Sequence, residues 1–370
     1  MKKSVKLLSI LLLIALLCLS GCSKRTETPE AAPTEAPVEE VTPEPTAEPT
    51  PEPTPEPTPE PTPEVEVAAG PVNPLTGEAV EKDIAAQRPF AVQMNNHQQA
   101  LPQCGISAAS IIYEMPEEGI TRMTAIYPQE PGIDRIGSIR SARPYHTEVA
   151  KSYDAIFVHW GASTAGAQKI YEIYCGDDVD FVGNASAYSY RDPARADRAT
   201  EHTGFVTLEN LNKFLSDNSR RTEHEGEKDY GLRFSADVQP TGGSAESMAV
   251  FFCSKESDFR FDADKSAYIM SQYGGTQYVD GDTNEPVYFK NVIFLRAGIA
   301  DESGLASIAL QNAGGEGIFC CNGKQEPITW KHNGYEDCFR YYRADGSELE
   351  LGIGRSYIAI ISYADALNIQ

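Results

Sequence analysis

Phe319-Cys320-Cys321-Asn322-Gly323-Lys324 is the stretch that says most about how this chain folds. Asn-Gly between two apolar, strand-like runs predicts a β-hairpin, because both central residues of a type I′ turn need positive φ. Asp345-Gly346 lies between two further strand-like runs, 340–343 and 348–351, and predicts a second hairpin of the same type. We therefore expect antiparallel strands joined by tight turns in this part of the chain.

Strand signals dominate the sequence from residue 245 onward. Short runs of β-branched and aromatic residues bounded by Gly, Pro, Asn or Asp are typical of strands. The strongest runs are Ala249–Cys253, Ala267–Gln272, Val292–Leu295, Ala306–Leu310, Gly317–Cys321 and Tyr357–Ile361. No helical pattern separates them, which argues against a doubly wound Rossmann topology in this half.

Helical and strand-like patterns alternate in the earlier part of the chain. Apolar periodicity predicts helices over Arg143–Ser152, Ser163–Tyr174 and Thr207–Ser216, and strands over Phe90–Met94, Arg122–Tyr127 and Asp154–Trp160. Pro144 suits a first helical turn, and Thr207 is a typical N-cap. The sequence thus predicts an α+β protein, with a mixed α/β N-terminal domain over residues 71–240 followed by a smaller β-rich C-terminal domain over 245–370.

The N-terminus has the layout of a bacterial lipoprotein signal peptide. Lys2, Lys3 and Lys6 precede an apolar run that is too short to span a bilayer as a helix. Leu19-Ser20-Gly21-Cys22 is similar to a lipobox, in which the Cys thiol receives a diacylglycerol before cleavage. We expect residues 1–21 to be the signal peptide and Cys22 to be the lipidation site, which anchors the protein to the outer face of the bacterial cytoplasmic membrane. The alternative is an ordinary secretory signal with an accidental Cys.

Residues 22–70 predict a disordered stalk behind the lipid anchor. They consist mainly of Pro, Glu and Thr, with a repeating Thr-Pro-Glu-Pro unit in the later part. Frequent proline forbids helices and sheet ladders, and the glutamates repel one another, so the segment should be extended. The alternative is a proline-rich ligand for a partner domain.

Composition and the absence of common motifs exclude some classes of partner and cofactor. The formal net charge is −23 at pH 7, whereas nucleic-acid binding needs Lys and Arg to displace counterions, so we expect no nucleic-acid partner. The 6 histidines show no metal-ligand spacing. Neither a nucleotide-binding loop nor a GxSxG nucleophile elbow occurs, so we expect no metal and no cofactor.

The cysteines allow two interpretations. Of 8 cysteines, Cys18 leaves with the signal peptide and Cys22 is the lipid acceptor. The others are Cys104, Cys175, Cys253, Cys320, Cys321 and Cys338. An exported location permits disulfides, but no CxxC pair is present. The pattern fits one or two disulfides, or mostly buried free thiols.

Arginines cluster in one stretch of an otherwise acidic protein. Arg122 is followed by Arg140 and Arg143, which lie in a segment framed by Gly and Pro just before Pro144. Guanidiniums beside a helix start can hold a carboxylate or phosphate, so these three are candidate anion-binding residues. The alternative is pairing inside the fold with a nearby acidic residue. The acidic candidates are Glu114, Glu117, Glu118 and Asp134.

Three further positions are candidates for a site. His159 ends the most apolar strand, where α/β proteins often place site residues. His159 and Glu118 are therefore candidate catalytic residues that could move protons. Arg191 lies in a charged loop and is a further candidate for anion binding. The structural alternatives are a core His159 bonded to a carbonyl and a local Arg191–Asp192 ion pair.

These stretches also carry a family resemblance. From Asn73 to the C-terminus the sequence resembles the YerB-type bacterial lipoproteins, a family whose molecular function is uncharacterised. The matching stretches are 73–77, 92–96, 102–103, 113–114, 118–122, 136–145, 153–159, 191–192, 291–292 and 323–330. The resemblance implies a mixed α/β N-terminal domain followed by a smaller β-rich domain. The chain departs from the family pattern at Leu101, at Ala109 and over 201–203.

Two functions are consistent with these observations. The first is a membrane-anchored extracytoplasmic lipoprotein that binds cell-wall polymer or another envelope protein, or maintains the envelope. The second is an enzyme acting on an anionic envelope glycan or phosphate polymer through an arginine-lined site. An enzyme needs the candidate groups to converge in one cleft, whereas a binding module can have arginines buried in pairs.

Overall fold

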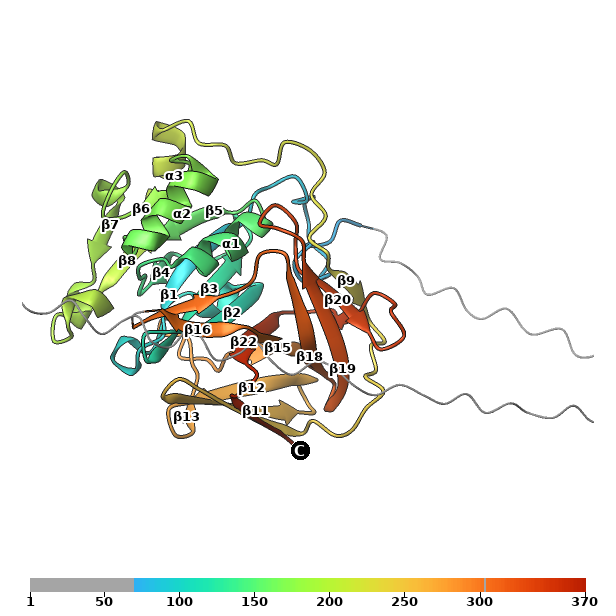
Figure 1. Cartoon of the computed structure of the whole chain (residues 1–370). Helices are drawn as coiled ribbons and strands as arrows, with labels where there is room; N and C mark the ends of the chain where they lie inside the picture. Colours follow the sequence, from blue (N-terminus) through green and yellow to red (C-terminus); the bar gives the residue numbers. More distant parts are fainter. Residues whose placement is uncertain (1–69, 303) are drawn as a thin grey trace, which may run out of the picture. The chain divides into compact units, whose positions relative to one another are not determined.

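The computed structural model describes residues 70–302 and 304–370, and Figure 1 shows how its elements are arranged. The predicted signal peptide over 1–21, Cys22 and the predicted stalk up to residue 69 lie outside these residues. Within the described range, no helix is long and apolar enough to cross a membrane. The described residues belong to one compact unit.

All three predicted helices are present. They are α1 (Pro144–Ser152), α2 (Thr164–Tyr174) and α3 (Leu208–Asp217). Pro144 takes the first turn of α1 as expected. The hydroxyl oxygens of Ser163 and Thr207 accept hydrogen bonds from the backbone N–H groups of Gly166 and Asn210, which caps α2 and α3.

Strands make up most of the remaining regular structure. The earlier strands are β1 (Phe90–Asn95), β2 (Ile111–Glu117), β3 (Ile120–Tyr127), β4 (Arg135–Gly137), β5 (Ile156–His159), β6 (Val179–Asp180), β7 (Ser189–Arg191), β8 (Gly204–Thr207) and β9 (Arg233–Ser235). The later strands are β10 (Ser247–Phe252), β11 (Lys255–Asp262), β12 (Ala267–Gln272), β13 (Thr276–Gln277), β14 (Tyr288–Phe289), β15 (Asn291–Ala297), β16 (Ile299–Glu302), β17 (Leu305–Ile308), β18 (Ala313–Cys321), β19 (Lys324–His332), β20 (Arg340–Arg343), β21 (Glu350–Gly352), β22 (Ser356–Ser362) and β23 (Ala366–Ile369). Helices and many strands together give the overall α+β class.

One large sheet takes strands from both predicted domains. Its order is β20-β19-β18-β15-β22-β2-β3-β1-β5-β6. The strand β22 lies near the C-terminus of the chain and pairs in parallel with β15 on one side and with β2 on the other. Strands from both sides of the predicted boundary at residues 240–245 therefore belong to the same sheet. The division of the chain into two domains at this point stays a prediction.

The large sheet is covered on both faces. Because side chains alternate along a strand, Phe157 on β5 faces one side while Val158 faces the other. Phe157 packs in a core with α1 and α2, and Val158 packs in a core that includes α3 and the second sheet. That second sheet has the order β13-β12-β11-β10-β23 and lies below the large one in Figure 1.

The two predicted hairpin turns differ in geometry. Asn322 and Gly323 both have positive φ and join β18 to β19, as a type I′ turn requires. At the second turn only Gly346 has positive φ. The N–H group of Gly346 donates to Arg343 O, and the N–H group of Arg343 donates to Ser347 O. The type I′ prediction at Asp345 is therefore wrong. The loop is one residue longer than that of a type I′ turn, and Gly346 takes the left-handed position that follows a type I turn.

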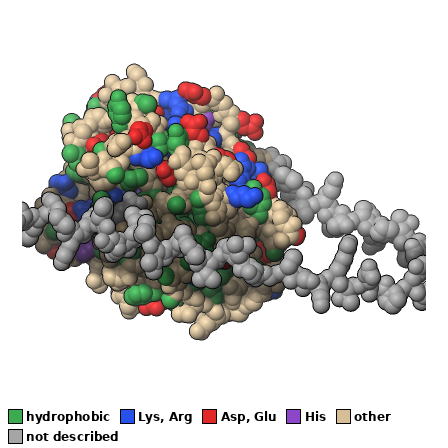
Figure 2. Space-filling view, in the orientation of Figure 1, with side chains coloured by type: hydrophobic (Ala, Val, Ile, Leu, Met, Phe, Trp, Pro, Cys, Tyr) green, Lys and Arg blue, Asp and Glu red, His purple; other side chains and the backbone are tan. Residues whose placement is uncertain are grey.

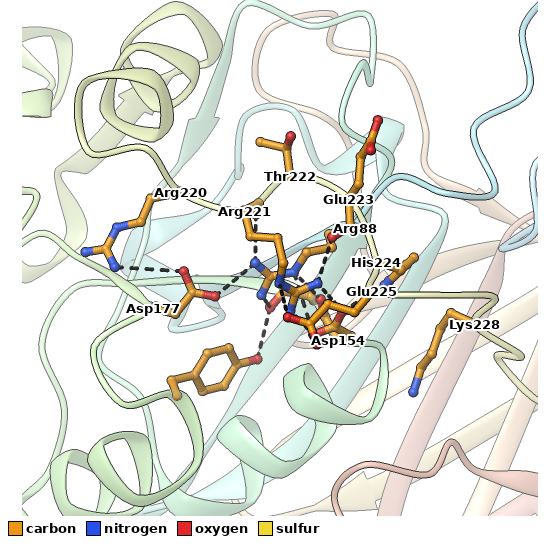
Figure 3. A network of polar contacts seen from close by, with 12 residues as sticks. Arg88, Asp154, Asp177, Arg220, Arg221, Thr222, Glu223, His224, Glu225 and Lys228 are labelled. Carbon is orange, nitrogen blue, oxygen red and sulfur yellow. Dashed lines mark hydrogen bonds and ion pairs between the residues drawn. The ribbon is translucent and has the colours of Figure 1, made fainter.

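A polar network attaches the segment 220–224 to the start of β1 (Figure 3). The buried Arg88 donates from Nη1 to Asp177 Oδ2 at 2.9 Å and to the carbonyl oxygen of Arg221 at 2.7 Å. Arg221 in turn makes two hydrogen bonds to Asp154, at 2.7 and 2.6 Å, and His224 lies 2.8 Å from the same carboxylate. Arg88, Asp154, Asp177, Arg221 and His224 thus all have partners, and the network holds the connection between α3 and β9 in place.

The six cysteines outside the N-terminal segment are free thiols. Cys104, Cys320, Cys321 and Cys338 are buried, and Cys175 and Cys253 are exposed. Burial raises the pKa of Cys104 to about 11 and that of Cys338 to about 12, so these thiols are unreactive. The interpretation as mostly buried free thiols is therefore the better one.

Candidate functional site

The predicted site residues lie near the carboxyl ends of β1 and β5, which are parallel neighbours in the large sheet. Loops that leave the carboxyl ends of parallel strands often bind ligands. Arg140 is fixed over this edge by its backbone. Its N–H donates to Gln93 O at 2.8 Å, and its carbonyl oxygen accepts from the N–H of Trp160 at 2.9 Å.

Two of the candidate anion-binding arginines already have carboxylate partners. Nη1 of Arg122 lies 2.5 Å from Oε1 of Glu117, and Nη2 of Arg143 contacts the same oxygen. Arg143 also donates two hydrogen bonds to Glu118, from Nε at 2.7 Å and from Nη2 at 2.6 Å. The side chains of Arg122 and Glu117 are almost completely buried. Arg122 and Arg143 therefore have little capacity left for an external anion.

Burial and pairing give the two neighbouring glutamates different pKa values. Burial raises the pKa of Glu117 to about 7, although Arg122 and Arg143 act in the opposite direction. Burial also acts to raise the pKa of Glu118, but hydrogen bonds from Arg143 outweigh it and the pKa is lowered. Burial lowers the pKa of Arg122 to about 10. Removal of Arg122 would leave the buried Glu117 with Arg143 as its remaining ion-pair partner, and removal of Glu117 would leave the buried Arg122 without a carboxylate.

Glu114 pairs with a lysine and not with the arginines. Nζ of Lys255 contacts Oε1 of Glu114, and both side chains are buried. The hydroxyl groups of Thr121 and Tyr357 also donate to this carboxylate, and Nδ2 of Asn96 does so at 3.0 Å. Glu114 therefore joins β2 to β11 and β22. It is not available to the arginine cluster.

Arg140 is the exception in the cluster. Among the residues described, its side chain has no ion pair and no hydrogen bond, and its buried Nε has no acceptor. Arg140 and Arg191 are linked through Trp160, whose backbone N–H donates to Arg140 O at 2.9 Å and whose ring carries the Arg191 guanidinium at 3.9 Å. The charge of Arg140 also adds to burial in lowering the pKa of Arg191. A positive charge without a counterion, next to a second arginine, is an arrangement that an external anion would stabilise.

Arg191 is held against an aromatic ring. Its guanidinium carbon lies 3.9 Å from the ring centroid of Trp160, and Nη1 donates to the carbonyl oxygen of Thr200 at 2.6 Å. The indole is also close to Gly204, where a Cβ would lie 2.5 Å from the ring. The proposed local pair with Asp192 is wrong, because Asp192 pairs with Arg135 at 3.1 Å. Arg191 is exposed and oriented by stacking.

The candidate catalytic residues are both engaged in the fold. His159 is buried, with Nδ1 at 2.9 Å from Gly161 O and Nε2 at 3.1 Å from Asp178 Oδ2. Both ring nitrogens have partners inside the fold, so the buried ring is not presented to a substrate. Glu118 is held by two hydrogen bonds from Arg143. The contacts of His159 match a core histidine bonded to a backbone carbonyl better than a residue that transfers protons.

A pair of stacked histidines beside Arg140 was not among the predicted site residues. The rings of His97 and His202 are 4.8 Å apart and nearly parallel. Nδ2 of Asn95 donates to Nδ1 of His202 at 2.9 Å, so the proton of the neutral ring is on Nε2. A sequence signal exists, because Asn95, Asn96 and His97 form a polar run directly after an apolar strand.

Basic and acidic side chains lie next to one another in several places on the upper part of the face shown in Figure 2. Such mixing is expected when most arginines have carboxylate partners, as the ion pairs of Arg122 and Arg143 illustrate.

No group of three or more His, Cys, Asp or Glu residues that could hold a metal ion occurs within residues 70–302 and 304–370. The site is therefore defined by Arg140, Arg191 and their neighbours.

Comparisons with known proteins agree on one family. Residues 75–221 match the N-terminal domain, and residues 248–358 the C-terminal domain, of a family described as "Protein of unknown function (DUF3048)". The curated protein "Putative lipoprotein YerB" of Bacillus subtilis (strain 168) is 30% identical over 308 residues, which cover 80% of this chain and 88% of YerB. The crystal structure of the YerB protein from Bacillus subtilis has a TM-score of 0.69 and 26% identity, and the match covers 80% of this chain and 99% of that chain. The chain therefore belongs to the DUF3048 family, together with YerB.

Proposed function

We propose that this protein is a membrane-anchored extracytoplasmic lipoprotein whose folded part binds an anionic polymer of the cell envelope. Arg140 and Arg191 hold the anionic groups. Diacylglycerol on Cys22 supplies the membrane anchor, which the relationship to a protein named as a lipoprotein supports. The acidic stalk gives the folded part reach from the membrane surface toward the polymer.

The observation that carries the proposal is the unpaired charge of Arg140. In a protein with a formal net charge of −23, Arg122 and Arg143 in the same cluster are paired, while Arg140 has no partner among the described residues. A half-buried positive charge at Arg140 without a counterion, with a second like charge at Arg191 nearby, is costly, and a bound anion offsets that cost. Guanidiniums suit phosphate and carboxylate oxygens because their N–H groups form a fixed fork.

The geometry favours binding over catalysis. A general acid or base must reach the proton that it transfers, whereas His159 is buried with partners at both ring nitrogens and Glu118 is held by two hydrogen bonds from Arg143. Binding of another envelope protein is the other way to use an exposed arginine pair. It would show as complex formation that anionic polymers do not displace.

The test compares two arginine variants of the full-length protein, purified in detergent. Arg140→Ala should weaken binding of an anionic polymer such as oligogalacturonate or poly(glycerol phosphate) by about ten-fold, as expected for the loss of a charged hydrogen-bonding group. Arg260→Ala is the matched control, because it removes the same charge at an exposed position. Arg260 lies on β11 in the second sheet, which does not contain the site. Equal binding by wild type, Arg140→Ala and Arg260→Ala, measured by calorimetry, would contradict the proposal.

A further inference from the structure

A cavity of about 500 Å³ opens beside the stacked histidines. It is lined by Gln98, Gln99, Leu101, Asp197, Arg198 and Ala199. Its volume is in the range of about 300–1,000 Å³ that is typical of small-molecule sites. Its walls come from the segment after β1 and from the segment after β7, the strand that ends at Arg191.

The cavity is built on a fixed backbone. Nη1 of Arg198 donates to the carbonyl oxygens of Leu101 at 2.9 Å and Gln99 at 3.2 Å. The buried Arg195 donates to Ala100 O at 2.7 Å and Pro102 O at 2.5 Å. Arginines from one wall thus satisfy the carbonyl groups of the other, which keeps the two segments at a constant separation.

The amide groups in the cavity wall are free to bind a ligand. Gln98 and Gln99 are exposed, and within the described chain their side chains make no hydrogen bond to the protein. An amide both donates and accepts hydrogen bonds, so it suits a hydroxyl group, which does the same. The carboxylate of Asp197 also accepts from hydroxyl groups, and its charge offsets that of Arg198 in the same lining. With no net charge and two free amides, the lining fits a neutral, hydroxylated unit better than a second phosphate or carboxylate.

Contacts of the chain connect the cavity to the arginine pair. Nη1 of Arg191 donates to the carbonyl oxygen of Thr200 at 2.6 Å, and Thr200 directly follows Ala199 in the cavity wall. His202, two residues further on, stacks on His97, which directly precedes Gln98 in the opposite wall. Arg191 also stacks on Trp160, whose backbone N–H donates to Arg140 O. A ligand that reaches both the arginines and the amide-lined cavity is therefore compatible with this arrangement.

From this juxtaposition we infer that the bound polymer alternates anionic groups with hydroxylated units, and that Gln98 and Gln99 select it over a chain that is anionic throughout. The inference rests on the proposed function, because it assumes that Arg140 and Arg191 hold the anionic groups. Phosphodiester-linked polyols and uronate glycans share this chemistry. An inorganic polyphosphate or an acidic peptide has the charges without the hydroxyl groups.

The experiment measures three ligands of matched charge by calorimetry with the full-length protein in detergent. The ligands are oligo(glycerol phosphate), oligogalacturonate and inorganic polyphosphate. The double variant Gln98→Ala/Gln99→Ala should lose about ten-fold in affinity for the hydroxylated oligomers, as expected for two hydrogen bonds, and bind polyphosphate as wild type does. Gln277→Ala is the control, because Gln277 is exposed on β13, at an edge of the second sheet.

The outcomes separate the inference from the proposed function. If the double variant binds all three ligands like wild type while Arg140→Ala weakens them, the amides do not select the ligand and the inference is wrong. If polyphosphate binds wild type as tightly as the hydroxylated oligomers do, the inference is also wrong. If Arg140→Ala changes none of the affinities, the proposed function is wrong, and the inference that rests on it is wrong as well. The two hydroxylated ligands, compared with each other, show whether phosphate or carboxylate is preferred.

Discussion

The guanidinium carbon of Arg191 lies 3.9 Å from the ring centroid of Trp160. Trp160 itself is hydrogen-bonded through its backbone to Arg140, so one residue positions both arginines of the site. Stacking suits a planar guanidinium and orients its remaining N–H groups toward solvent. The arrangement makes the shape of the Arg191 side chain important, and not its charge alone.

Arg191→Lys should weaken binding of an anionic polymer several-fold although the charge is kept. An ammonium group on a flexible stem lacks the planar fork and stacks less well on the indole. Calorimetry with the same polymer for wild type and variant gives the ratio of affinities. Arg260→Lys serves as the control. Unchanged affinity of Arg191→Lys would mean that only the charge matters at this position.

Arg122→Ala should destabilise the protein by roughly 3–5 kcal/mol, because it leaves the buried carboxylate of Glu117 with one partner fewer. Arg140→Ala should change the free energy of unfolding by only about 0.5 kcal/mol, since its side chain has no partner in the described chain. Urea denaturation of both variants measures the difference. A large loss of stability for Arg140→Ala would show that this residue, too, is structural.

Glu117→Gln and Glu118→Gln should change the pH dependence of stability with opposite sign. The pKa of Glu117 is raised by folding, so its contribution to stability is present below the unfolded pKa and is lost as pH rises through about 7. The pKa of Glu118 is lowered, so its contribution is present above the unfolded pKa and is lost as pH falls through the folded one. Relative to wild type, Glu117→Gln therefore gains stability with rising pH, and Glu118→Gln falls behind. Urea denaturation at several pH values checks both slopes, and parallel curves would refute the assignment.

Arg140→Ala should raise the pKa of His202. Burial and His97 lower this pKa, and the charge of Arg140 contributes further in the same direction. Glu201→Gln should lower the pKa of His202, because the carboxylate of Glu201 acts to raise it. NMR titration of the His202 ring measures both shifts. A pKa of His202 that does not respond to Arg140→Ala would place the two side chains further apart than the structure does.

Cys22→Ala should move the protein out of the membrane fraction, because the Cys22 thiol is the proposed acceptor of the diacylglycerol. Metabolic labelling with a radioactive fatty acid, followed by fractionation, measures both acylation and location. Cys175→Ala is a suitable control, since Cys175 is an exposed thiol at the end of α2. Label that persists in Cys22→Ala would show that the lipid is attached elsewhere.

Features that depend on neighbouring residues could be predicted from the sequence. Thr207 and Ser163 cap helices because a hydroxyl group needs to reach a backbone N–H only three residues away. Asn322-Gly323 specifies its own turn, as both residues tolerate positive φ. The second hairpin shows the limit, because an Asp-Gly pair also fits the longer turn found at Gly346.

Features that depend on distant residues could not be predicted. Glu114 and Lys255 form a buried pair although they are 141 positions apart, and nothing near either residue in the sequence marks the other. His97 and His202 meet only because the segments after β1 and β7 fold over the same edge of the sheet. Arg122, Arg140 and Arg143 were predicted as a cluster, but which of them lacks a partner depended on the exact position of Glu117 and Glu118.

The central position of β22 has a consequence for how the chain matures. Residues 356–362 are synthesised long after β2, yet they lie between β15 and β2 in the middle of the large sheet. Until they arrive, β2 has an unpaired edge that could pair with other chains. Contacts between residues so far apart in sequence also make folding slow. A chain cut short before β22 would therefore be a candidate for aggregation and proteolysis, and quality control can recognise an incomplete copy by its open sheet.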